Sequence, residues 1–271
     1  MSALRERVLA GQPLTDLLVI DSHAHMGPWF NFHIPSCDAA GMVRTMDRLG
    51  VSACIASAHA SIGPDFRLGN DTIARAIAAH PGRIYGYIGV NPNYPADEMR
   101  EELRRCRAIP GFVGIKLHPD VHRVRADDER YTPAWEFAAE QNLPVLSHAG
   151  AGSAFNSPSH FDRPAEAHSQ VAIILAHSAS AQESMDAAVD LARKRANVHL
   201  DICGSPLLIW ALEQLVERLG SERILFGTDL PFIDPRPGLG RLAFARIAEE
   251  QKRDLLGRNA ARIFGIGPKN F

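Results

Sequence analysis

Short apolar runs alternate with longer amphipathic stretches along most of the chain. The apolar runs are nearly continuous, as is typical of strands buried on both faces of a parallel sheet. Eight such runs are found, at 17–20, 51–57, 84–90, 112–117, 143–147, 171–176, 198–202 and 223–227. Helix-like stretches follow most of them, at about 36–49, 70–80, 96–107, 133–141, 182–195 and 207–219, with two closing stretches at 240–250 and 254–264. Strand-helix alternation of this kind predicts parallel βαβ units.

Eight such units in 271 residues predict the α/β class and a single (β/α)₈ TIM barrel with an extra C-terminal helix. A doubly wound open sheet is the competing fold, but it normally carries a glycine-rich phosphate turn after its first strand. The sequence has no such turn after residue 20. It also has no linker rich in proline or serine, so residues 1–271 are expected to form one domain.

Composition and charge narrow the range of partners. The chain has 29 Lys and Arg against 31 Asp and Glu, a formal net charge of −2, without a basic run. We therefore expect neither a nucleic acid nor a membrane partner. The partner that we do expect, a small-molecule substrate, follows from the candidate site residues and not from the charge. Residues 1–12 lack the apolar core of a signal peptide, and no segment approaches the ~20 apolar residues of a membrane span.

Cysteine usage bears on the compartment. The four cysteines lie far apart and form no C-x-x-C pair. We interpret them as reduced thiols and predict a cytoplasmic protein. Barrels of this kind often assemble into homo-oligomers, but the sequence identifies no interface.

Two histidines at the end of the first apolar run are the first sign of chemistry. His23 and His25 are separated by one residue, so in a strand their side chains point to the same side. That spacing suits two ligands of one metal ion. An isolated H-x-H is a weak signal, and two unrelated histidines are the plain alternative.

Further ligand-type residues recur at the ends of later apolar runs. These are Lys116, His148, His177 and Asp229. Because one βα unit takes roughly 30 residues, their spacing places them on strands four, five, six and eight. All would lie at the C-terminal ends of the strands, where barrel active sites are built.

The residue types in this set indicate a catalytic metal site. Imidazole and carboxylate suit Zn²⁺, Fe²⁺ or Mn²⁺, and the set contains no cysteine that would narrow the choice. Three neutral histidines and one carboxylate leave a position for water, which the metal would acidify into a nucleophile. Asp229 would accept the proton of that water, and His177 would polarise the substrate.

These motifs together resemble a known family. They are DSHAHMG at 21–27, GIKLHP at 114–119, LPVLSHAG at 143–150, AHS at 176–178 and FGTDLPF at 226–232. In this order they resemble the amidohydrolase superfamily, and in particular the amidohydrolase-2, or amidohydrolase-related, branch of metal-dependent TIM-barrel enzymes. The stretch LLGRNAARIFGI at 255–266 is similar to the closing helix of that branch.

The resemblance implies a role for each strand-end residue. His23, His25, His148 and Asp229 would be metal ligands. His177 would act on the substrate in a mononuclear site or bind a second metal in a binuclear one. Lys116 stands where some members carry a carboxylated lysine that bridges two metals, whereas in others a basic residue there holds a substrate carboxylate. We favour one divalent metal, zinc first, with manganese or iron as alternatives and a second metal if Lys116 is carboxylated.

Other residues are candidates for the pocket or its support. His59, after the second strand, and Trp29, in the apolar loop after the H-x-H, would line a substrate pocket. Phe30 and Phe32 follow Trp29 in the same loop, and packing against the barrel rim is the alternative for all three. We expect Asp21 to steady the end of the first strand.

The resemblance implies a site more firmly than a reaction. Our main prediction is a metal-dependent hydrolase of a small amide, lactone or ester. The alternative is a metal-dependent non-oxidative decarboxylase of a small aromatic or unsaturated carboxylic acid. Some decarboxylases of the family have Glu in place of the first histidine of H-x-H, so His23 favours hydrolysis. A third hypothesis, a catalytically inactive barrel that serves as a scaffold, leaves the ligand set unexplained.

Overall fold

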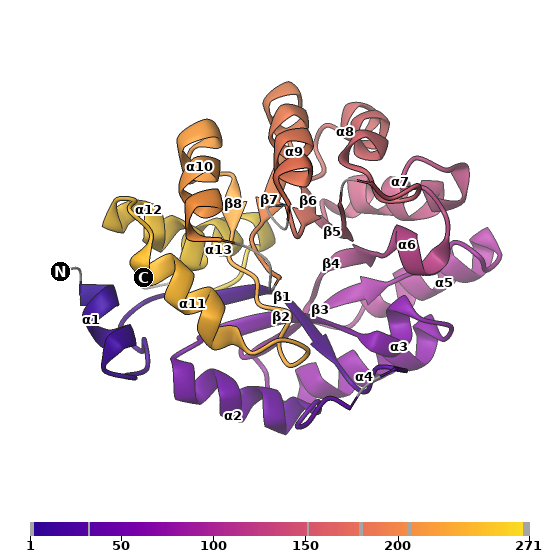
Figure 1. Cartoon of the computed structure of the whole chain (residues 1–271). Coiled ribbons are helices and arrows are strands. Elements are labelled where there is room, and N and C mark those ends of the chain that lie inside the picture. Colours follow the sequence, from indigo (N-terminus) through magenta and orange to yellow (C-terminus); the bar gives the residue numbers. More distant parts are fainter. Residues whose placement is uncertain (1–2, 32, 151, 179–180, 205–207, 268–271) are drawn as a thin grey trace.

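A single eight-stranded sheet forms the centre of the molecule (Figure 1). The structure is a computed structural model and describes residues 3–31, 33–150, 152–178, 181–204 and 208–267. Each strand pairs in parallel with the next along the chain. The strands are β1 (Ile20–Met26), β2 (Ala53–Ala58), β3 (Ile84–Gly89), β4 (Phe112–Leu117), β5 (Val145–His148), β6 (Ile173–Ala176), β7 (Val198–Asp201) and β8 (Ile224–Leu225).

The sheet closes on itself between its first and last strands. A parallel bridge joins Ala24 to Leu230, just beyond β8. The backbone N–H of Ser22 also donates to the carbonyl of Phe226 at 2.9 Å, and that of His25 to the carbonyl of Leu230 at 2.8 Å. Together with the helices between the strands, this confirms the predicted TIM barrel.

Helices surround the sheet on its outer face (Figure 1). The main ones are α2 (Ala39–Leu49), α4 (Phe66–Ala79), α5 (Ala96–Arg107), α7 (Thr132–Gln141), α9 (Gln182–Lys194), α10 (Ile209–Leu219) and α11 (Pro235–Phe244). Shorter ones are α1 (Ala3–Leu9), α3 (His59–Ile62), α6 (Pro119–His122), α8 (Asp162–Ala167), α12 (Glu249–Arg253) and α13 (Asn259–Phe264), with 3₁₀ segments η1 (Glu129–Tyr131) and η2 (Pro158–Phe161) and a π segment η3 (Asp254–Arg258).

The structure differs from the sequence prediction at several element ends. The helix expected from residue 36 begins at Ala39, because the Asp38 side chain accepts a hydrogen bond from the Gly41 N–H and caps it. The single helix expected at 240–250 is wrong: α11 ends at Phe244, and α12 starts separately at Glu249. The predicted start of a helix at residue 207 lies outside the described residues.

Two hydrophobic layers stabilise the barrel. The larger lies between the strands and the helices, and the smaller fills the barrel interior. Tyr87 belongs to the interior layer, where its hydroxyl donates to the carbonyl of Ser22 at 2.6 Å and its ring packs 5.7 Å from that of Phe264 in α13. Gly114 leaves room for this ring, since an added Cβ would lie 2.9 Å from it. The lower half of the barrel is therefore packed core, which leaves the carboxyl ends of the strands for a site.

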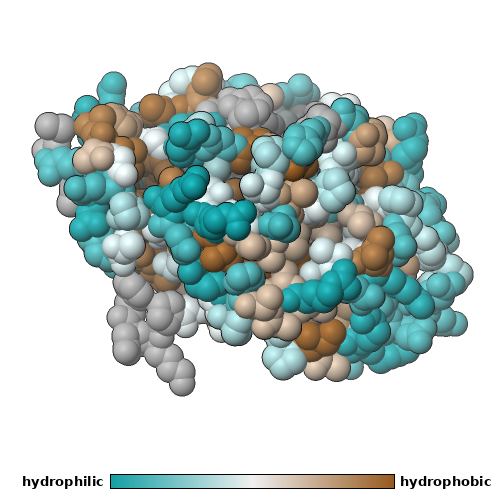
Figure 2. Space-filling view, turned by 90° about the horizontal axis from the view of Figure 1, so that it is seen from below, coloured by the Kyte–Doolittle hydropathy of each residue, from teal (hydrophilic) through white to brown (hydrophobic). Residues whose placement is uncertain are grey.

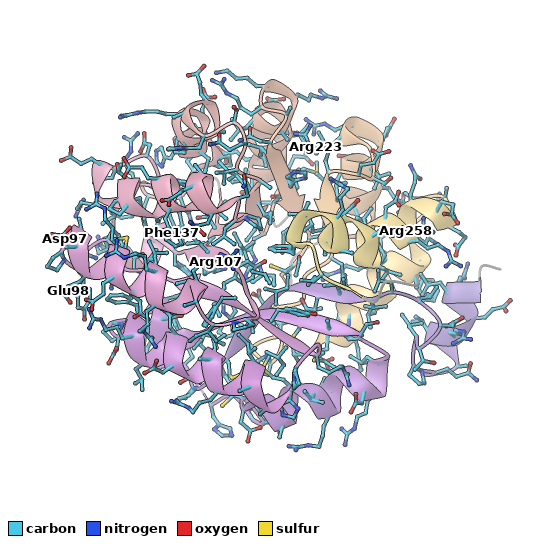
Figure 3. All side chains as sticks on the ribbon, turned by 180° about the vertical axis from the view of Figure 1, so that it is seen from behind. Asp97, Glu98, Arg107, Phe137, Arg223 and Arg258 are labelled. Atoms are coloured by element: carbon cyan, nitrogen blue, oxygen red, sulfur yellow. The ribbon has the colours of Figure 1, made fainter. Side chains whose placement is uncertain are left out.

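Polar contacts tie the outer layer to the strands. Arg223, labelled in Figure 3, precedes β8 and donates to the carbonyls of Ala192, Arg195 and Val198, which links α9 to β7. The face shown in Figure 2 is largely hydrophilic, with hydrophobic residues in small separated groups, which is ordinary for a protein surface. Within the described ranges, no helix has both the length and the apolar character that crossing a membrane requires.

Candidate metal centre

Residues from distant parts of the chain converge at the carboxyl ends of the strands. Asp229 follows β8, and one of its carboxylate oxygens, Oδ1, lies 3.3 Å from Nε2 of His23 and 3.4 Å from Nε2 of His25. Its other oxygen lies 3.7 Å from Nδ1 of His177, which follows β6. The two imidazoles of the first strand therefore face the aspartate beyond the eighth, as the spacing in the sequence predicts.

The end of β1 is fixed to the end of β8 by Asp21. Its carboxylate accepts hydrogen bonds from the backbone N–H of His23 at 3.1 Å and of Thr228 at 3.0 Å, and from the Thr228 hydroxyl. The backbone N–H of Asp229 donates to the carbonyl of His23 at 2.8 Å. Asp21 thus supports the strand end, as expected, and holds His23 and Asp229 in register.

Two residues of the cluster have an unusual backbone. His177 has φ 58° and Asp229 has φ 62°, in the left-handed region that non-glycine residues rarely adopt. Such a conformation costs on the order of 1–3 kcal/mol and is common at functional sites. Here it turns each side chain into the barrel mouth directly after its strand.

Lys116 lies inside the cluster, not at the surface. Its side chain is 1% exposed, and its Nζ lies 2.8 Å from Nε2 of His23. Burial lowers the pKa of its amine. The lysine side chain therefore does not extend to solvent, which is the ordinary arrangement at the end of a strand. Its predicted roles, a carboxylated bridge or a substrate anchor, stay predictions.

Cys203 belongs to the cluster, although the sequence-based set contained no cysteine. Its Sγ lies 2.9 Å from Nδ1 of His23 and 3.2 Å from Nδ1 of His177. One ligand atom from each of four side chains lies within 4.8 Å of the others: His23, His177, Cys203 and Asp229. The expectation of a purely nitrogen and oxygen set is thus wrong for the immediate surroundings of His23.

Asp201 is a second residue that sequence reasoning missed. It ends β7, is fully buried, and places Oδ2 3.3 Å from Nδ1 of His23. Its other oxygen accepts the Cys203 N–H at 2.6 Å. The sequence did contain a signal, because Asp201-Ile202-Cys203 follows an apolar strand just as the other site residues do.

His148 and His25 lie outside the four-residue cluster but close to it. The His148 ring lies 4.5 Å from that of His177 and stacks at 4.4 Å on the ring of His118. His25 Nδ1 lies 3.1 Å from the Ser57 hydroxyl, which leaves its Nε2 facing Asp229. Both histidines line a cavity of about 120 Å³ directly above the cluster.

The donor set fits a divalent cation. Burial lowers the pKa of His23, His25 and His148, so these imidazoles are neutral and offer lone pairs. Neutral imidazoles, a carboxylate and a thiol are ligands that zinc and related divalent metals accept. The Asp201 oxygen at Nδ1 of His23 matches the carboxylate that commonly orients a metal-binding histidine.

The predicted pocket residues also lie at this cavity. His59 starts α3, its Nδ1 donates to the Gly27 carbonyl at 2.7 Å, and its ring stacks 4.9 Å from that of His25. Trp29 packs 5.0 Å from the His59 ring. Both line the small cavity. Phe30 is 84% exposed, and Phe32 lies outside the described residues.

Comparison with known proteins agrees with the strand-end motifs. The model of the Amidohydrolase family matches residues 20–266, nearly the whole chain. The chain belongs to this family. It is thus an enzyme-type barrel of the amidohydrolase superfamily, as the motifs predicted.

Two curated relatives of this chain are decarboxylases. It is 24% identical over 243 residues to 2-amino-3-carboxymuconate-6-semialdehyde decarboxylase of Dictyostelium discoideum, with 74% of this chain and 67% of the relative covered. It is 26% identical over 263 residues to gamma-resorcylate decarboxylase of Rhodococcus jostii, with 74% and 76% covered. Hydrolysis, our main prediction, is therefore supported only at the level of the family.

Solved structures share the fold. The 5-carboxyvanillate decarboxylase of Sphingomonas paucimobilis superposes with a TM-score of 0.72 at 18% identity, covering 93% of this chain and 100% of that one. The enzyme of that name from Novosphingobium aromaticivorans, complexed with manganese and 4-hydroxy-3-methoxy-5-nitrobenzoic acid, gives a TM-score of 0.74 at 14% identity, covering 93% and 97%.

Proposed function

We propose that this member of the Amidohydrolase family is a metal-dependent non-oxidative decarboxylase of a small aromatic or unsaturated carboxylic acid. Decarboxylation, the alternative reaction predicted from the sequence, thus replaces hydrolysis as the preferred reaction. The structural observation that supports it is the cluster of His23, His177, Cys203 and Asp229, whose ligand atoms lie within 4.8 Å of one another below a cavity. The decarboxylase names of both curated relatives favour this reaction over the others of the family.

The cofactor in this proposal is one divalent cation. His23, His25 and Asp229 would hold it, with His148 or Cys203 completing the set. A bound cation would orient and polarise the carboxylate of the substrate. Manganese is named with two structural neighbours, and zinc also fits the neutral imidazoles, so zinc stays a prediction.

The chain's own residues would supply the proton that the reaction needs. Loss of CO₂ breaks a carbon–carbon bond and leaves its electron pair on the substrate carbon, which must then take up a proton. Asp229 and His177 both line the cavity, and Nδ1 of the histidine lies 3.7 Å from the aspartate oxygen Oδ2. We assign proton delivery to this pair: His177 would pass a proton taken up from solvent to the Asp229 carboxylate, which would then deliver it to the substrate carbon.

Hydrolysis of a lactone, amide or ester is the second candidate, and one feature favours it. The chain keeps His23 where some decarboxylases of the family carry Glu. The same Asp229 carboxylate would then accept a proton from water, the reverse of its role in decarboxylation.

The two reactions release different products, so one assay separates them. Metal-depleted protein is reloaded with Mn²⁺ or Zn²⁺ and incubated with aromatic acids, lactones and amides. We expect metal-dependent CO₂ release from at least one aromatic acid, lost in Asp229→Asn and kept in His33→Gln, a change at an exposed histidine. Acid production from lactones or amides without CO₂ release would instead establish hydrolysis. Equal activity of the metal-free and the metal-loaded protein would overturn both proposed reactions.

A further inference from the structure

A second, larger cavity adjoins the one above the metal centre. The small cavity, about 120 Å³, is below the 300–1,000 Å³ usual for small-molecule sites, whereas the neighbouring one measures about 600 Å³. Trp29 and His59 line both cavities. A molecule bound at the metal centre and too long for the small cavity would therefore reach the larger space past these two rings.

The wall of the larger cavity is mainly apolar. Its apolar side chains come from the end of β1 and the loop after it, from α4 and from α6, and include Met26, Pro28, Phe30, Leu68 and Val121. Two asparagines also line it, but their amide groups are already engaged. The Nδ2 of Asn91 donates to the Gly63 carbonyl at 3.2 Å, and the Nδ2 of Asn93 to the His122 carbonyl at 2.9 Å.

Neither cavity offers a cationic side chain for a second anion. Among the described residues that line the two cavities, none is Lys or Arg. Lys116 is buried behind His23 and does not line either one. A carboxylate placed in the larger cavity would give up part of its hydration against a mainly apolar wall without gaining a charged partner.

We propose that the substrate carries a single carboxylate, held at the metal centre, and an uncharged apolar portion of ring size that occupies the larger cavity. The inference rests on the proposed function and narrows it to monocarboxylic acids with an extended apolar part. Dicarboxylic acids of the same length are disfavoured. The uncharged portion would pass along the faces of Trp29 and His59, whose rings pack against each other with centroids 5.0 Å apart.

Calorimetric titration of the Mn²⁺-loaded protein with matched probes tests this. The probes are benzoate, a phenylbenzoate, and the dicarboxylate made by adding a second carboxylate to the distal ring of that phenylbenzoate. The 3- and 4-phenyl isomers are both measured, because the direction of the larger cavity decides which fits. We expect the better phenylbenzoate to bind at least about tenfold more tightly than benzoate, from burial of the second ring. The distal carboxylate should abolish that gain.

A variant locates the bound ring. Leu68→Trp, in α4 at a half-exposed position that lines only the larger cavity, should remove the advantage of phenylbenzoate and leave benzoate binding unchanged. Leu9→Trp is the control, because Leu9 is similarly exposed, in α1, and lines neither cavity.

The outcomes separate this inference from the proposed function. Metal-dependent binding of benzoate with no gain from the second ring, or a gain that Leu68→Trp leaves intact, would overturn the inference and spare the metal site. Tighter binding of the dicarboxylate than of the phenylbenzoate would overturn it as well. If no probe binds in a metal-dependent way, the inference and the proposed decarboxylase function both fail.

Discussion

The Nζ atom of Lys116 lies 2.8 Å from Nε2 of His23, although the two residues are 93 positions apart in the chain. The same imidazole nitrogen lies 3.3 Å from Oδ1 of Asp229. The lysine amine therefore faces the lone pair that a metal ion would use. An unmodified lysine in this place would compete with the cation for His23. A carboxylated lysine would instead be a ligand of the cation.

Replacing the lysine distinguishes these two roles. In Lys116→Met we expect the protein to keep its cation, with an affinity equal to or up to about tenfold higher than that of the wild type, because a competing and repulsive group is removed. Titration against a chromophoric chelator measures this affinity. Loss of one or more cations per chain would show instead that Lys116 carries a bridging carboxylate.

Cys203 contacts the Nδ1 atoms of both His23 and His177. Cys203→Ala removes the thiol that contacts these two buried nitrogens, which costs about 1–3 kcal/mol of unfolding free energy. Because the two imidazoles are then held less firmly, we expect weaker metal binding and kcat reduced about tenfold or more. Cys203→Ser should retain most of both, since a hydroxyl also donates and accepts. The buried Cys54 of β2 provides the control: Cys54→Ala should lower stability and leave metal affinity unchanged. Equal metal affinity and equal kcat in Cys203→Ala, Cys203→Ser and Cys54→Ala would contradict this role of the Cys203 thiol.

Gly227 lies where the barrel closes behind the site. A Cβ added there would lie 2.5 Å from Oδ2 of Asp201 and 2.7 Å from Cβ of His23. We expect Gly227→Ala to cost about 1–3 kcal/mol of unfolding free energy and to weaken metal binding by displacing His23. Gly240→Ala, in α11 with nothing within 4 Å of the added atom, should be neutral or stabilising by up to about 1 kcal/mol. Urea denaturation measures the unfolding free energy of both variants. Equal changes in Gly227→Ala and Gly240→Ala would refute the steric argument.

His199 makes stability depend on pH. Its side chain in β7 is 7% exposed, and burial, with Arg223 nearby, lowers its pKa to about 4. In the unfolded chain its pKa is near 6.5, so below pH 6.5 the unfolded state binds a proton that the folded state excludes. The free energy of unfolding therefore falls as pH decreases from 6.5 to 4, by roughly 2 kcal/mol at pH 5 from this residue.

Substitution of His199 should remove that dependence. We expect His199→Gln to lose less stability than the wild type between pH 7 and pH 5 in urea denaturation, by about that amount. His33→Gln, at an exposed position, should follow the wild-type curve. Parallel curves for wild type and His199→Gln would contradict the shifted pKa.

The sequence predicted the barrel because its strands are buried on both faces and read as continuous apolar runs. It placed His23, His25, His177 and Asp229 near one another because parallel strands in a closed barrel end on one face. Asp201 was missed because it fell inside the predicted strand at 198–202 and not after its end, and Cys203 because only imidazole and carboxylate ligands were expected. The larger cavity was beyond sequence reasoning, since loops and helices far apart in the chain form its wall.

The metal content of the purified protein tests the central claim most directly. Wild type, His23→Ala, Asp229→Ala and the control His33→Gln are stripped, reloaded with Mn²⁺ or Zn²⁺, dialysed against a weak chelator and assayed by elemental analysis. The convergence of His23 and Asp229 on one cation predicts about one ion per chain in the wild type and control, and almost none in the two site variants. Full retention in the site variants, or no uptake by the wild type, would contradict it.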